Sequence, residues 1–302
     1  MPELRHACTS CGGSCSGVRV RVLDVERANA IEAYAEAFAI EQPFDNGALR
    51  QTEEGRCVFL NAQNLCRIHA RYGADAKPLI CRQYPIVGVR TESGARRGID
   101  PGCYSAFSTQ SAEVLIPNEP FAWSQSQYPE PLERMEQALI AMLSASGQTL
   151  EGVVARLAGQ PEATWPDGLL QRLKQRVSHA DFIAAATHPS AGPAVRAGLL
   201  PIVSELQKNQ PWQTELTMNS DFEMWALEAT KRVIWLRLCP NMPSPMIACL
   251  MSILGAVVVA STVSQKDMQV SGFTAWNRAM RSPMFWGHFF PDLNAVQWVL
   301  RG

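Results

Sequence analysis

Hydrophobic and polar residues follow a helical period through most of the second half of the chain. Apolar positions recur there every three to four residues, and prolines separate the periodic stretches, a pattern that predicts consecutive helices. The predicted helices span residues 131–146, 150–157, 167–177, 193–207, 221–238, 246–264 and 271–280, with a last short one that starts at Asp292. The region after residue 130 is therefore expected to be all-helical.

The first hundred residues show a different pattern. Residues 18–23 alternate apolar and polar side chains, which predicts a short half-buried strand. Asp24 is placed to cap a helix whose apolar positions continue to Phe38. Residues 86–90 and 96–100 predict a hairpin around a Glu-Ser-Gly turn. Glycine, proline and cysteine dominate the rest, so this region is expected to be rich in loops.

These patterns together predict a mainly α fold with an unlike N-terminal part. A length of 302 residues favours about two domains, at about 150 residues each. We expect a loop-rich, cysteine-containing metal-binding domain with short strands over residues 1–105. A linker rich in Ser, Thr, Gln and Pro follows over 106–130, and a helical domain spans 131–302.

The charge balance excludes one class of function. The chain carries 27 basic and 28 acidic residues, for a net charge of −1, and 47% of its residues are apolar. The two parts are equally balanced, with 13 basic and 14 acidic residues in 1–120, and 14 of each in 121–302. A general nucleic-acid binder shows a basic excess. We therefore expect a globular protein that binds no nucleic acid.

One apolar run is long enough to raise the question of a membrane. Residues 246–263 contain no charge and reach 18 residues, the lower limit for crossing a bilayer. Ser252, Ser261 and Thr262 interrupt the run, and no basic cluster flanks it. Small residues such as Gly255 would let neighbouring helices approach closely. We expect a buried central helix and no membrane association.

The cysteines are the most uneven feature of the sequence. Seven of the nine lie within the first 103 residues. The N-terminus shows no basic segment followed by an apolar run, so we expect a cytoplasmic protein. Structural disulfides are rare in a reducing cytosol, whereas thiolates are good ligands for zinc and for iron–sulfur clusters. Clustered thiols therefore predict a metal site.

The spacing of these residues fits metal coordination. Cys8, Cys11 and Cys15 form a C-x2-C-x3-C run in which two glycines provide backbone freedom. The further candidate ligands are Cys57, Cys66, Cys81, Cys103 and His69. Zinc takes four N or S ligands, and a 4Fe–4S cluster takes four cysteines. Eight candidates suffice for two such sites, or for one cluster with some cysteines merely buried.

The two remaining cysteines and two residues next to predicted ligands are not expected to bind the metal themselves. Cys239 and Cys249 lie in apolar helical surroundings and are expected to be inert core thiols. His6 precedes the first cysteine by two residues and is expected to be flexible. Arg82 follows Cys81 and could neutralise thiolate charge, or could lie over Tyr84 at the surface.

Four blocks carry a resemblance to a known family. Cys8–Cys15, Cys57-Val-Phe-Leu, Cys66-Arg-Ile-His and Lys77-Pro-Leu-Ile-Cys81-Arg-Gln-Tyr-Pro85 resemble the YkgJ-like cysteine-cluster family. That family is a zinc- or iron-chelating domain with a CxxCxxCC signature, and it includes the flagellin lysine N-methylases. The resemblance covers about residues 6–105. Ser14 stands where the signature has its third cysteine, which makes His69 a candidate substitute.

The resemblance implies a function that the residues alone do not reveal. It implies an enzyme that modifies a protein substrate, namely a lysine N-methyltransferase that uses S-adenosylmethionine. No G-x-G-x-x-G loop follows a strand, so a Rossmann-like donor site is not predicted. A cluster with one open iron position could still bind the donor. The alternative is a non-catalytic module in which zinc stabilises the N-terminal loops and the helices bind a partner.

Overall fold

The computed structural model describes residues 4–9, 11–16, 20–113, 121–176, 179–187, 193–207, 216 and 218–301. The fold is mainly α, as predicted, with short strands near the N-terminus and a helical C-terminal region. The chain forms two compact units. The first comprises Met1–Gly88, Arg97–Trp123 and Gly192–Ala194, and the second comprises Val89–Arg96, Ser124–Ala191 and Val195–Gly302. The expected linker over 106–130 stays a prediction, and its residues 114–120 lie outside the described residues.

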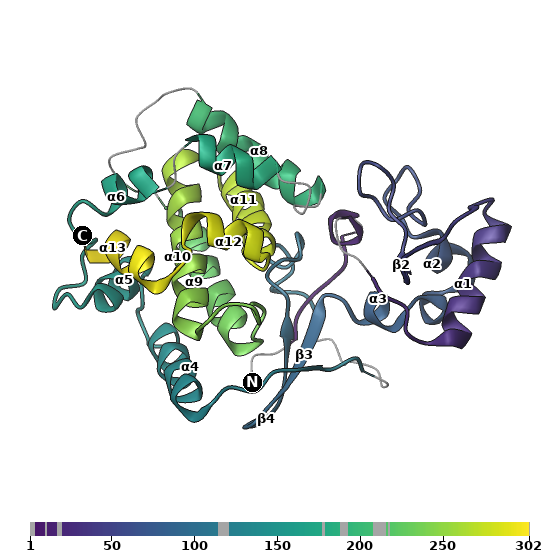
Figure 1. Ribbon diagram of the computed structural model, residues 1–302, viewed down its shortest axis with the longest axis horizontal. Coiled ribbons are helices and arrows are strands. Elements are labelled where there is room, and N and C mark those ends of the chain that lie inside the picture. The colour runs from purple at the N-terminus through teal and green to yellow at the C-terminus, as the bar shows by residue number, and fades with distance from the viewer. Residues whose placement is uncertain are drawn as a thin grey trace. The chain divides into compact units, whose positions relative to one another are not determined.

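The first unit begins with a capped helix and a tight hairpin (Figure 1). Helix α1, Val25–Ala37, is capped by Asp24. The Asp24 carboxylate accepts hydrogen bonds from the backbone N–H groups of Glu26 and Arg27, at 3.0 and 3.2 Å. Strands β1, Phe44–Asp45, and β2, Ala48–Leu49, pair antiparallel around an Asn-Gly turn. Both turn residues have positive φ, as this two-residue hairpin requires.

Short helices follow in the same unit, with Cys66 directly before the first of them and Cys81 within the last. They are α2, Arg67–Tyr72, the 3-10 turn η2, Ala74–Ala76, and α3, Leu79–Gln83. A small apolar core joins them to α1. Its buried members are Ile31, Ala35, Leu49, Phe59, Ile68 and Ala76, and Cys57, Cys66 and Cys81 pack against it. The core therefore lies directly behind three of the candidate ligands.

A three-stranded sheet follows, with the strand order β4-β3-β5. Strands β3, Ile86–Thr91, and β4, Gly94–Ile99, form the predicted hairpin. Strand β5, Ser124–Gln125, pairs parallel to β3. The predicted strand over 18–23 is not found as such. Residues 17–19 lie outside the described part of the chain, and Arg21 makes only a single antiparallel bridge to Ala48.

The second unit is built from ten helices among the residues that the structure describes. They are α4, Glu130–Leu143, α5, Leu150–Ala158, α6, Leu169–Arg176, α7, His179–Thr187, α8, Pro193–Gln207, α9, Ser220–Trp235, α10, Pro245–Thr262, α11, Lys266–Ala279, α12, Pro283–Phe289, and α13, Leu293–Arg301. Sequence patterns missed α7 and α12, and placed the start of α11 five residues late. Helices α7 and α12 contact each other, which indicates that packing rather than a repeating pattern stabilises them.

Helix α10 forms the centre of this unit, as predicted. It contacts α4, α9, α11 and α13, and 89% of it is buried (Figure 1). It is the one helix in the described ranges that is long and apolar enough to span a bilayer. Gly255 explains the close packing, because a Cβ atom there would lie 2.3 Å from the Trp276 ring. The Trp276 indole donates a hydrogen bond to the Met251 carbonyl at 2.9 Å.

A buried ion network connects the sheet to α4 within the second unit. Arg237 donates to both carboxylate oxygens of Glu136, at 2.8 and 3.0 Å, and also to Glu92. Arg96 forms a second ion pair with Glu136 at 2.9 Å. The side chains of Arg237 and Glu136 are fully buried. Each buried charge is therefore paired, as the low dielectric of a protein interior requires.

Candidate metal centre

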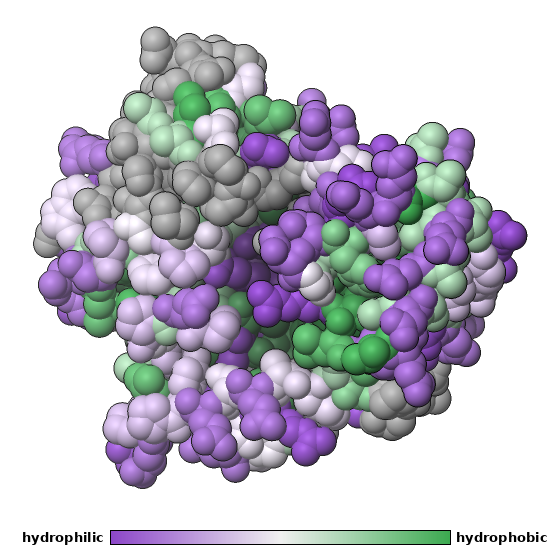
Figure 2. Space-filling view, turned by 45° about the vertical axis from the view of Figure 1, so that its right-hand side comes forward, coloured by the Kyte–Doolittle hydropathy of each residue, from purple (hydrophilic) through white to green (hydrophobic). Residues whose placement is uncertain are grey.

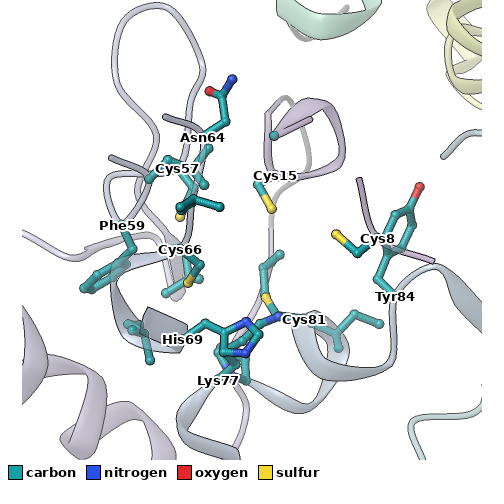
Figure 3. Close-up of a pocket in the computed structure, with 18 of the residues that line it drawn as sticks. Cys8, Cys15, Cys57, Phe59, Asn64, Cys66, His69, Lys77, Cys81 and Tyr84 are labelled. Atoms are coloured by element: carbon teal, nitrogen blue, oxygen red, sulfur yellow. The ribbon is translucent and has the colours of Figure 1, made fainter. Parts of the chain in front are cut away.

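All eight candidate ligands line one cavity in the first unit. Its volume is about 210 Å³, and every lining residue belongs to that unit. The candidates are Cys8, Cys11, Cys15, Cys57, Cys66, His69, Cys81 and Cys103. Figure 3 shows the labelled sulfur atoms arranged around a common space. The fold thus brings together residues from positions 8 to 103.

The wall of the cavity is otherwise mostly apolar. Its lining includes Val20, Leu49, Phe59, Leu60, Leu65, Ile68 and Ile80. Of these, Leu65 and Ile80 are 43% and 38% exposed, so the apolar lining reaches the surface. Figure 2 shows apolar side chains among hydrophilic ones on the face that it presents. The described lining contains no Asp, Glu or Arg, and Lys77 is its single lysine.

The last of the first three cysteines, Cys15, ends a short turn. A 3-10 turn, η1, covers Gly13–Cys15, and the Cys15 N–H donates to the Gly12 carbonyl at 3.0 Å. Gly12 has a φ of +66°, and a Cβ atom there would lie 2.6 Å from the Asn64 Cβ. Only glycine combines this backbone angle with this close approach. The turn is thereby seated against the loop that leads to Cys66.

Backbone hydrogen bonds hold Cys57 and Cys66 beside this turn. The Cys57 N–H donates to the Cys15 carbonyl at 3.2 Å. Cys66 forms an antiparallel bridge with Leu60 and then begins α2, where its carbonyl accepts from Ala70 at 2.9 Å. His69 follows within the first turn of α2. These contacts explain how residues some fifty positions apart come to face one cavity.

Cys81 and Lys77 reach the cavity from one compact segment. The Lys77 N–H donates to the Ala74 carbonyl at 3.1 Å, which closes η2. Pro78 then begins α3, and its carbonyl accepts from Cys81 at 2.9 Å. Figure 3 shows Lys77, Cys81 and His69 on the same side of the cavity.

Burial makes the inner thiols weak acids. Desolvation raises the pKa of Cys57 to about 11 and that of Cys81 to about 12. It also raises the pKa of Cys15, a residue that is exposed as a whole but whose thiol faces the cavity. Negative charge on neighbouring thiols raises all three pKa values further, whereas the Lys77 ammonium lowers those of Cys15 and Cys81. Without a bound cation these thiols are therefore protonated at neutral pH.

The wall around Cys103 is a hydrogen-bonded group. The Cys103 Sγ lies 3.3 Å from the Ser105 Oγ, which lies 3.5 Å from the His6 Nε2. The Thr109 hydroxyl donates to the Ser105 carbonyl at 2.6 Å, so it must accept from the His6 Nδ1 at 2.9 Å. This assigns the Nδ1–H tautomer to a neutral His6. Burial also lowers the pKa of His6, which agrees with the neutral form.

One expectation about a neighbouring residue requires correction. His6 is 5% exposed and held by Thr109, so the expectation of a flexible histidine was wrong. The signal in the sequence was weak, because its hydrogen-bond partner lies 103 residues away. Arg82 does not line the cavity and pairs with Asp75 at 3.2 Å. The cation among the thiols is Lys77, which sequence reasoning quoted within a motif without assigning it a role.

The remaining observations concern how tightly the thiols are grouped. Among the residues that the structure describes, no three His, Cys, Asp or Glu side chains gather closely enough to hold a single ion. The sulfur atoms share a cavity and do not converge on one point. Cys239 and Cys249 lie outside the cavity and are 3% and 0% exposed, which confirms that they are core residues. Burial raises the pKa of Cys249 to about 12.

Comparison with known proteins gives one match. Residues 7–104 match the CxxCxxCC family model, described as "Putative zinc- or iron-chelating domain". This range covers all eight candidate ligands and supports metal binding by the first unit. No curated protein and no solved structure matches the chain.

Proposed function

We propose that the first unit, which matches a zinc- or iron-chelating domain, holds a 4Fe–4S cluster among its thiols. The observation that carries the proposal is that all seven N-terminal cysteines line one cavity, together with a single lysine. Thiolates are soft ligands that suit iron–sulfur clusters and zinc. The donor set therefore fits such a group, which would supply electron transfer.

The size of the cavity favours a cluster over a single zinc ion. Zinc–sulfur bonds measure about 2.3 Å, so the four sulfur atoms of a structural zinc site pack closely around one ion. A cubane cluster places four iron and four sulfide atoms between its thiolates and needs a hollow. The thiols here surround about 210 Å³, a space with apolar walls. A cavity of this size therefore favours a 4Fe–4S cluster over a single zinc ion.

Four cysteines are the best candidates for direct ligands. Cys15, Cys57, Cys66 and Cys81 influence one another's charge, and three of them pack on the apolar core behind the cavity. Cys8 and Cys11 are exposed and influence only Cys15 among the thiols with shifted pKa values. Cys103 is occupied with Ser105. We assign Cys15, Cys57, Cys66 and Cys81 as the ligands of the cluster.

Elemental analysis of protein purified without oxygen tests this proposal. A brown protein with absorbance near 400 nm, about four iron atoms per chain and matching sulfide is expected. Colourless protein with stoichiometric zinc would contradict it and would favour the zinc-stabilised interaction module. Cys249→Ser serves as a control, because this core thiol lies outside the cavity.

The resemblance to flagellin lysine N-methylases extends the proposal to a protein-modifying enzyme in the cytoplasm. Cys8, Cys11 and Cys15 are exposed, so solvent and a small molecule can reach the thiols from this side. We propose S-adenosylmethionine as that molecule and a protein lysine as the methyl acceptor. The test is to add the donor to reconstituted protein and follow the cluster by electron paramagnetic resonance. An unchanged spectrum would argue against donor binding while leaving the cluster in place.

A further inference from the structure

We propose that Lys77 is the residue that sets the reduction potential of the centre. The inference rests on the proposed iron–sulfur cluster and goes beyond it by assigning a positioning charge. The starting observation is that Lys77 lines the cavity together with the thiols. Reduction potentials of iron–sulfur clusters depend on net charge, hydrogen bonds to sulfur and solvent exposure.

Lys77 differs from the other residues that line the cavity because it is the single lysine among them and no carboxylate lines the cavity with it. The described lining residues include no carboxylate and no arginine, and the two other titratable cations are His6 and His69. His6 is neutral because of burial and its hydrogen bonds. Lys77 forms no ion pair with a carboxylate in the described ranges. Its ammonium therefore has no carboxylate partner among the described residues, and its side chain lines the same cavity as the thiols.

Local structure fixes where this charge can reach. The backbone of Lys77 is held between η2 and Pro78, and Arg27 donates to the neighbouring Ala76 carbonyl at 3.0 Å. Lys77 also precedes Cys81 by four residues, on the segment that begins α3. The ammonium influences Cys81 and Cys15, which come from opposite ends of the unit's sequence. The backbone of Lys77 is thus fixed beside the cavity that its side chain lines.

The direction of the effect follows from charge. A 4Fe–4S cluster with four thiolate ligands is an anion, and accepting one electron makes it more negative. A nearby cation stabilises the reduced form more than the oxidised form, particularly in a cavity with apolar walls. Lys77 should therefore raise the reduction potential, and removing its charge should lower it.

Redox titration of the reconstituted full chain tests this inference, with dithionite as the electron donor and electron paramagnetic resonance as the readout. Lys77→Met should lower the reduced-to-oxidised ratio at a fixed potential about tenfold, which equals about 59 mV for one electron. Lys77→Gln provides the same charge removal if the Met variant does not fold. Lys77→Arg should restore most of the potential, a result that a purely structural role for the lysine stem would not produce.

Arg82→Gln is the matched control. Arg82 is a cation five residues away that pairs with Asp75 and does not line the cavity, so its removal should leave the potential unchanged. An unchanged potential in both Lys77→Met and Lys77→Gln, with wild-type iron content, would overturn the inference and leave the cluster standing. An equal shift in Arg82→Gln would also overturn it. Wild-type protein that holds only zinc would overturn the proposed function, and the inference with it.

Discussion

The glycine at the start of the cysteine turn offers a direct test of how the cavity is built. Gly12→Ala places a methyl group at a residue with a φ of +66°, where the added Cβ would lie 2.6 and 2.8 Å from the Cβ and Cγ of Asn64. Asn64 cannot move away easily. Its own φ is +62°, and its side-chain oxygen accepts a hydrogen bond from Arg56 at 2.8 Å.

The loss of stability in Gly12→Ala has two contributions, and a substitution at a second glycine measures one of them alone. A non-glycine residue in the left-handed region costs roughly 1–2 kcal/mol. Gly47 has a φ of +74° and nothing within 4 Å of an added Cβ, so Gly47→Ala incurs this cost alone. Gly12→Ala adds steric overlap with Asn64, for which roughly 1–3 kcal/mol is typical of crowded positions. We expect the unfolding free energy of Gly12→Ala to fall by about 2–5 kcal/mol in all.

Metal content distinguishes the two variants as well. Gly12→Ala must shift either the turn that carries Cys15 or the loop that leads to Cys66, so it should bind metal more weakly. Gly47→Ala should retain the metal content of the wild type. Urea unfolding of the loaded protein, followed through the absorbance of the centre, provides both measurements. Equal losses of stability and equal metal content in the two variants would refute the reasoning.

Three further outcomes are expected. Cys57→Ser should abolish the absorbance of the reconstituted centre, while Cys249→Ser should retain it, because only the first thiol lines the cavity. Burial raises the pKa of Cys15 and brings those of Cys57 and Cys81 to about 11 and 12, so zinc must displace three protons from these thiols at neutral pH. Zinc affinity should therefore rise about a thousandfold per pH unit from 7 to 8 in chelator competition, and an affinity independent of pH would contradict those protonation states. A hydrogen bond from Arg237 lowers the pKa of Glu92 from 4.5 to about 2, so the stability that it contributes is present above pH 4.5 and is lost as the pH falls towards 2. Glu92→Gln should flatten acid unfolding in that window, as measured by circular dichroism, and an unaltered acid transition would count against the role of this ion pair.

Periodic patterns were most informative where helices are long. The helices α8 and α10 were predicted to within a few residues, because their apolar positions and terminal signals agree with the packing that they meet. Helices α7 and α12 were missed, since short helices depend on contacts made elsewhere in the chain. The burial of α10 was predictable from its lack of charge. The close approach of a neighbouring element at Gly255 was predictable from the small size of glycine.

The candidate ligands could be listed from residue type and spacing, because a thiol is a metal ligand wherever it is placed. Their grouping could not be predicted, since hydrogen bonds such as that between Cys57 and Cys15 connect positions 42 residues apart. That all of them line one cavity depended on these contacts.

The identities of the seven cysteines and the helical period thus follow from the sequence, because both depend on chemistry local to each residue. The tertiary structure decided which charges meet. It directed Lys77 towards the thiols, paired Arg82 with Asp75 outside the cavity, and held His6 neutral against Thr109. Electrostatic interactions act through space, so only the folded chain determines which of these side chains influences the centre.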